Sequence, residues 1–200
     1  MKKFITLALS FLLLFTAVAC NNRAQGQPES ANKVADKTFF NTYSGLYDKS
    51  IGTLGAYNMY TDVETTTNAY KDREYPGNEK YLSDVKAAYK DSREKIRSFV
   101  DGLKNDVKTD DAELKKMNED LIVEGEKLIK DIDGKIAKLD KITKNDYNKT
   151  QDEFIRLVND TVTAGENVGN GFNRMLRDMN VRLGIDRSTI KDNNAHDTTK

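Results

Sequence analysis

The chain has 200 residues, of which 38% are hydrophobic, and its 32 basic side chains balance 32 acidic ones. This length suits one domain, and the balanced charge gives no overall field that would favour nucleic acid or an anionic membrane surface. One cysteine and one histidine, His196 near the C-terminus, argue against a disulfide framework, a multi-cysteine metal site, a histidine-based triad and a zinc protease motif.

The first residues form a distinct apolar segment. Lys2 and Lys3 precede a nearly unbroken apolar run from Phe4 to Val18. A basic start followed by an apolar run shorter than the roughly 20 residues of a membrane span is typical of a secretory signal peptide.

The segment ends in Ala17-Val18-Ala19-Cys20, which resembles the lipobox of bacterial prolipoproteins, although Ala17 stands where that family usually has leucine. The resemblance implies that residues 1–19 are a cleaved lipoprotein signal peptide and that Cys20 is the lipid attachment residue. Two or three acyl chains hold a protein on a bilayer almost permanently. The alternative is an ordinary secreted protein with a free cysteine.

Residues 20–36 are predicted to be the lipidated cysteine and a flexible tether. The stretch after Cys20 is polar, contains Gly26 and Pro28, and lacks periodic apolar residues. Fully extended, about 15 residues reach roughly 50 Å. Asn21 is not the aspartate that retains enteric lipoproteins in the inner membrane, so the resemblance favours the outer membrane.

The remaining chain has helical rather than strand periodicity. The first predicted helix covers about 37–72, with a kink or break expected near 52–55 because glycine costs about 1 kcal/mol relative to alanine within a helix. The second begins near Asn78, after the turn signal Tyr75-Pro76-Gly77.

The clearest apolar stripe runs from Leu114 to Ile142 at steps of three and four residues, and it predicts a third helix of about 30 residues. A fourth helix is predicted from about Asn145 to Leu183, and Thr150-x-x-Glu153 is an alternative capping box for its start.

These segments predict an all-α fold, an elongated antiparallel bundle of about four long helices over residues 37–187. Residues 188–200 are polar and are predicted to form a disordered tail.

No pattern predicts catalysis, a metal site, a cofactor, nucleic-acid binding or a small-molecule substrate. Asp131-x-Asp133-Gly134 resembles part of a calcium loop but lacks its remaining ligands. The close carboxylate pairs, such as Glu124 and Glu126, lie among lysines, where ion pairs along a helix are the ordinary explanation.

Tyrosine is the most unevenly distributed residue type, since eight of the nine tyrosines fall within residues 43–89. Rigid, amphipathic tyrosine rings are favoured at recognition surfaces, and they also close the edges of helical cores. The residues assigned to a possible partner-binding face are Tyr43, Tyr47, Tyr57, Tyr60 and Tyr81.

Tyr57-Asn58-Met59-Tyr60 is similar to a stretch in the YiiG-like helical lipoproteins, whose function is unknown. The function expected from the sequence is a non-enzymatic, lipid-anchored protein of the bacterial cell envelope that binds a protein partner at the cell surface. The alternative is a periplasm-facing structural or envelope-assembly factor.

Overall fold

The computed structural model describes residues 36–60, 62–71, 73–164 and 168–185. The predicted signal peptide, Cys20, the tether and the polar tail lie outside these residues. The described elements are α1 (Lys37–Lys49), the 3₁₀ helix η1 (Ile51–Tyr60), α2 (Val63–Ala69), α3 (Asn78–Asn105), α4 (Ala112–Leu139), the 3₁₀ helix η2 (Lys144–Asn148), α5 (Gln151–Thr163) and α6 (Gly169–Arg182).

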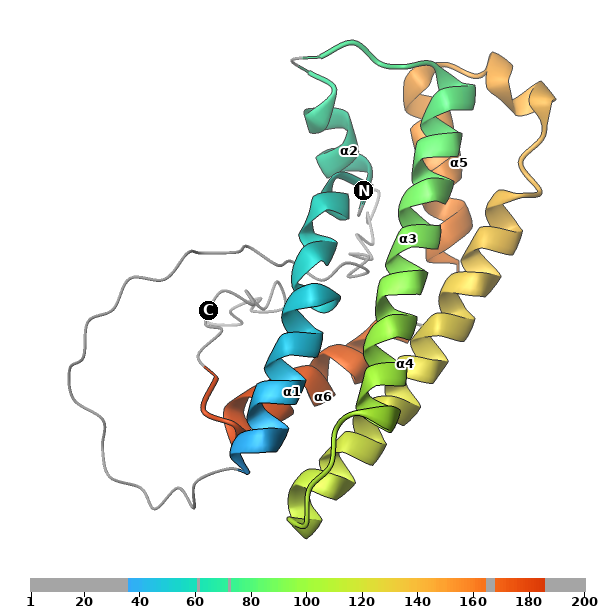
Figure 1. Cartoon of the computed structure of the whole chain (residues 1–200). Coiled ribbons are helices and arrows are strands. Elements are labelled where there is room, and N and C mark those ends of the chain that lie inside the picture. The colour runs from blue at the N-terminus through green and yellow to red at the C-terminus, as the bar shows by residue number, and fades with distance from the viewer. Residues whose placement is uncertain (1–35, 61, 72, 165–167, 186–200) are drawn as a thin grey trace, which may run out of the picture.

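The all-α prediction is confirmed, since the described residues contain helices and no strand (Figure 1). The prediction of four long helices is not confirmed. The second and third correspond to α3 and α4, each of 28 residues. The first and fourth are divided into shorter helices.

The first predicted helix ends at Lys49, and the chain continues through η1 into α2. Gly52 and Gly55 fall within η1, where their low helix propensity removes the preference for a continuous α-helix. The kink expected at 52–55 is therefore a change of helix type that begins at Ile51.

The fourth predicted helix starts later than Asn145. Thr143 and Asp146 cap the short η2, and Thr150 with Glu153 forms a second capping box at the start of α5. Ala164 then adopts an extended conformation (ψ 107°), and α6 begins five residues further on, at Gly169. The capping box at Thr150 therefore separates η2 from α5, whereas α6 begins without a side-chain cap at Val168.

The helices α3 and α4 form an antiparallel hairpin. Ion pairs cross between them from one end to the other, with Lys86 and Asp140 at 2.8 Å, Arg93 and Asp133 at 2.7 Å, and Lys104 and Glu126 at 2.6 Å. These exposed pairs contribute little free energy each. They line the rim of a buried apolar contact between the two helices, which supplies most of the stabilisation.

The hairpin packs closely at Gly125 of α4. A Cβ atom there would lie 2.5 Å from Val100 Cγ2 of α3 and 3.2 Å from Phe172 Cε2 of α6. The missing side chain therefore lets α3 and α6 approach α4 at the same level. Phe172 also contacts Phe99, with ring centroids 6.3 Å apart.

The two ends of the bundle are formed by different elements (Figure 1). The start of α1 and the end of α6 lie at one end, where the Tyr43 hydroxyl donates to Asn180 Oδ1 at 3.0 Å and Arg182 pairs with Asp111. The connection from α2 to α3 and the 3₁₀ helix η2 lie at the opposite end. Among the described helices, none is long and apolar enough to cross a membrane.

Replacing Gly125 with alanine should destabilise the protein. The added methyl group overpacks the α3–α4–α6 junction, which costs about 1–3 kcal/mol and exceeds the gain in helix propensity of about 0.5–1 kcal/mol. Gly134 is the matched control on the same helix, because no atom lies within 4 Å of its added Cβ. In urea unfolding, the free energy of unfolding of G125A should be lower than that of the wild type, and that of G134A should be higher. Equal free energies of unfolding for the two variants would contradict the packing argument.

Candidate functional site: the tyrosine-rich end

Three of the five tyrosines assigned to a binding face lie in the core. Tyr43 and Tyr47 are 0% and 1% exposed and pack against Phe99, with ring centroids 5.9 and 6.4 Å away. Tyr81 is 2% exposed. These rings form no exposed face in this conformation, because Tyr43 and Tyr47 continue the buried stripe that begins at Phe39. All three therefore have the other role considered for tyrosine, which is to close the helical core.

The other two tyrosines lie in η1. The Tyr57 side chain is outside the description, and Tyr60 is half-buried. Tyr60 contacts Tyr81 with its ring tilted, and the ring centroids are 6.2 Å apart. This contact connects η1 to the first turn of α3.

Tyr81 is the centre of a larger group of rings, which we call the aromatic end cluster. Its centroid lies 6.2 Å from Tyr70, 5.7 Å from Tyr75 and 6.3 Å from Phe154. The members are Tyr60, Tyr70, Tyr75, Tyr81, Tyr147 and Phe154, contributed by η1, the α2–α3 region, α3, η2 and α5. Tyr81 and Phe154 are buried, whereas the other four are half-buried and present part of each ring to solvent.

Arg73 extends the cluster with a positive charge. Its guanidinium carbon lies 4.7 Å from the centroid of the Tyr70 ring, within the range of a cation–π contact. Tyr70 in turn meets Tyr75 edge to face at 5.2 Å. The Arg73 guanidinium and the tyrosine rings therefore lie next to one another at this end of the bundle.

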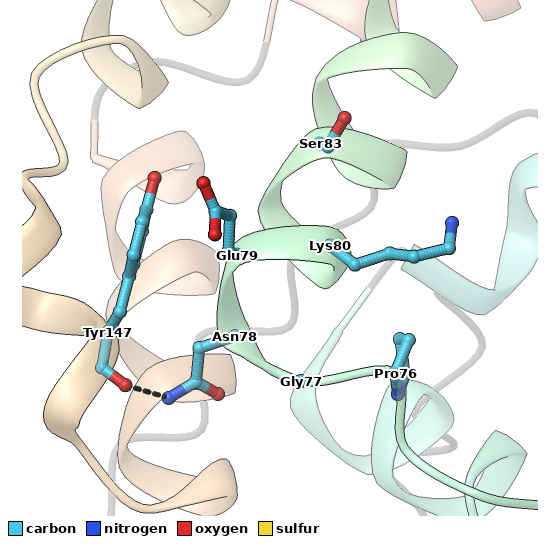
Figure 2. Close-up of a pocket in the computed structure, with 7 residues that line it drawn as sticks. All are labelled: Pro76, Gly77, Asn78, Glu79, Lys80, Ser83 and Tyr147. Carbon is cyan, nitrogen blue, oxygen red and sulfur yellow. Dashed lines mark hydrogen bonds between the residues drawn. The ribbon is translucent and has the colours of Figure 1, made fainter.

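Asn78, at the start of α3, ties the parts of this end together. Its amide nitrogen donates to the backbone carbonyls of Tyr147 at 3.1 Å and Lys149 at 2.8 Å, and its Oδ1 accepts from the Tyr75 hydroxyl at 2.8 Å. Figure 2 shows the contact between Asn78 and Tyr147. One side chain thus fixes the α2–α3 connection and η2 against α3.

A hollow of about 670 Å³ lies beside Asn78. Its lining comes from the start of α3 and from η2, namely Pro76, Gly77, Asn78, Glu79, Lys80, Ser83 and Tyr147. Figure 2 shows the Glu79 and Lys80 side chains pointing in different directions from the first turn of α3. The lining therefore contains a carboxylate, an ammonium, a hydroxyl and an aromatic ring.

Tyr60, Tyr75 and Tyr81 are neutral phenols over the physiological range. Burial raises the pKa of Tyr60 to about 12 and raises the pKa of Tyr75 and Tyr81 above the ordinary value of 10.0. The neighbouring Tyr70 phenol adds to the increase for Tyr60. Each hydroxyl can therefore both donate and accept a hydrogen bond.

The acidic motifs noted in the sequence have other partners. Asp131 pairs with Lys135 at 2.7 Å, whereas Asp133 pairs with Arg93 of α3. Glu124 pairs with Lys127. Within the part of the chain that the structure describes, no group of three or more His, Cys, Asp or Glu side chains could hold a metal ion.

The sequence indicated the tyrosine-rich region but not the surface that it forms. Tyr70 and Tyr75 belong to the run of tyrosines noted above, but their helical spacing gave no common face. Tyr147 and Phe154 join from a distant segment, and no local signal connects them to Asn78.

Comparisons with known proteins give no further assignment for this site. No family model matches the chain. No curated protein and no solved structure matches it either.

The raised pKa of Tyr60 predicts a dependence of stability on alkaline pH. A tyrosine in the unfolded chain ionises near pH 10, before the folded Tyr60, so the unfolded state binds fewer protons between about pH 10 and 12. The contribution of Tyr60 to stability is therefore complete below pH 10 and is lost as the pH rises towards 12. The Y60F variant should lose stability less steeply in urea unfolding over this range; parallel curves would contradict the assignment.

Replacing Asn78 with alanine should destabilise the tyrosine-rich end by about 1–2 kcal/mol, because two backbone carbonyls and the Tyr75 hydroxyl lose a partner. Glu79 is the matched control, since it is the next residue and is exposed. We expect E79A to change the free energy of unfolding by less than about 0.5 kcal/mol. Equal effects of N78A and E79A in urea unfolding would show that the Asn78 contacts are not structural.

Proposed function

We propose that this chain is a non-enzymatic, lipid-anchored protein of the bacterial cell envelope that binds a protein partner through its tyrosine-rich end. The proposed anchor is acylated Cys20, at the end of the lipobox-like sequence Ala17-Val18-Ala19-Cys20. Asn21 favours the outer membrane. Residues 21–36 serve as the tether in this proposal.

The observation that carries the proposal is the separation between the start of α1 and the aromatic end cluster. The chain enters the helical domain at Lys37, at the end opposite to the α2–α3 connection (Figure 1). The 28-residue α3 helix alone corresponds to about 42 Å at 1.5 Å per residue. A domain tethered through its N-terminus can therefore direct the aromatic end cluster away from the membrane.

The chemistry of that end suits protein recognition. Tyr60, Tyr70, Tyr75 and Tyr147 are half-buried, so each ring is held by neighbours and still offers an edge or a face to a partner. Tyrosine provides large contact area at a small cost in side-chain entropy, and arginine is likewise enriched at binding hot spots. In this proposal Tyr81 supports the surface from below, and Tyr43 and Tyr47 stabilise the core.

The anchor and the orientation can be tested in the bacterial host. Wild-type protein should incorporate labelled palmitate, and C20A should not. Protease added to intact cells should remove the helical domain of the wild type if it is displayed at the surface. Labelling that persists in C20A would contradict the anchor.

The binding surface has its own test. A photo-crosslinking phenylalanine analogue at position 70 or 75 should give a discrete adduct in intact cells. Val181, which is 79% exposed at the opposite end, is the control position. Adducts of equal yield from position 181, or none from positions 70 and 75, would contradict recognition by the tyrosine-rich end.

The antiparallel α3–α4 hairpin favours a second candidate, a periplasm-facing structural or assembly factor. Two 28-residue helices joined along their length form a stiff element suited to a spacer between envelope layers. This alternative predicts that protease removes the domain only after the cells are lysed.

A further inference from the structure

A second hollow lies against α4 and shares no lining residue with the hollow beside Asn78. It has a volume of about 420 Å³ and is bounded by one face of α4 and by the residue that precedes α6. We call it the lysine hollow, and its lining residues are Lys127, Lys130, Asp131, Gly134, Lys135, Lys138 and Val168.

Two of the four lysines have their charge compensated by carboxylates. Lys135 is only 6% exposed, and its ammonium lies 2.7 Å from Asp131 Oδ2. Burial lowers the pKa of Lys135, and the adjacent Asp131 opposes this effect. Lys127 lies 2.6 Å from Glu124, whose carboxylate reaches the position where a Gly171 side chain would be.

The other two lysines form no ion pair with a carboxylate in the part of the chain that the structure describes. Lys130 is exposed and forms no ion pair among the described residues. Lys138 donates to the Ala164 carbonyl at 2.6 Å, which holds its ammonium at the rim of the hollow without neutralising it. An ammonium group has three N–H donors, so Lys138 retains donors for a ligand.

Gly134 opens a gap between these two charges. Lys130, Gly134 and Lys138 are spaced by four residues and therefore follow one row along α4, with about 6 Å between successive positions. No atom lies within 4 Å of a Cβ built at Gly134. A compact anion over this glycine could reach both flexible lysine side chains.

We propose that the lysine hollow binds a phosphate group, held between the ammonium groups of Lys130 and Lys138 above Gly134. Lysine binds phosphate as a concentrated point charge, and charge-assisted hydrogen bonds are stronger than neutral ones. The source of the phosphate is either a free phosphate or phosphomonoester, or the phosphodiester of a lipid headgroup. This inference is independent of the partner proposed for the tyrosine-rich end.

The test is isothermal titration of the full chain in neutral detergent with inorganic phosphate at constant ionic strength. K130Q should weaken binding about tenfold, the loss of one charged partner. K115Q is the matched control, because it removes the same charge from an exposed position on α4 outside the hollow. Equal weakening by both variants would overturn the site in favour of a general charge effect, as would the absence of phosphate binding to the wild type.

A second pair of variants tests the geometry without removing a charge. G134L fills the gap and should abolish binding, whereas G134A should retain affinity within about twofold. Circular dichroism confirms that each variant is folded. Unchanged binding by G134L would overturn the placement of the anion.

The source of the phosphate is resolved by repeating the titration with glycerol phosphate and with glycerophosphoglycerol. Stronger binding of the monoester assigns the site to a soluble phosphate compound, and stronger binding of the diester assigns it to a lipid headgroup. A preference for either compound supports binding in the lysine hollow only if the G134L variant no longer shows that preference.

Discussion

The close approach of α3 and α6 to α4 at Gly125 determines how the rest of the bundle is arranged. Without a side chain at that position, Val100 and Phe172 occupy the space beside the α4 backbone. Phe172 then places α6 so that Asn180 meets Tyr43 of α1. Protein interiors are close-packed, so a shift at this junction would move α1 as well as α6. One small residue therefore links the central hairpin to both ends of the chain's helical part.

The sequence predicted the central hairpin well because its signals are local and consistent. An apolar stripe with helical period runs through each helix, and Asp111 caps α4 by accepting from the backbone N–H groups of Glu113 and Leu114. The same period misled the prediction of the fourth helix. Val162 and Phe172 preserve an apolar spacing across a segment where Ala164 is extended, and periodicity cannot detect such a gap. The capping box at Thr150 was the better signal for where α5 starts, and no capping side chain marks the start of α6.

The candidate site was only partly predictable, because tyrosine is suited both to a buried core and to an exposed surface. A spacing of four residues places Phe39, Tyr43 and Tyr47 on one face of the helix. Because this face begins with a phenylalanine, the pattern indicates that the face is buried. This signal could have assigned Tyr43 and Tyr47 to the core. The contact of Asn78 with the Tyr147 carbonyl joins residues 69 positions apart. Such a contact depends on the packed topology, and no single-sequence pattern contains it.

The aromatic end cluster depends on the helix that starts within it. Tyr75, Asn78 and Tyr81 lie within seven residues at the beginning of α3, and Asn78 holds both the preceding connection and η2. The remainder of α3 packs on α4 as far as the end where α1 begins. The position of the half-exposed tyrosines relative to Lys37 is thus set by a continuous packed helix rather than by the exposed ion pairs, which contribute little each. A partner bound at this end would contact a surface whose orientation the core determines.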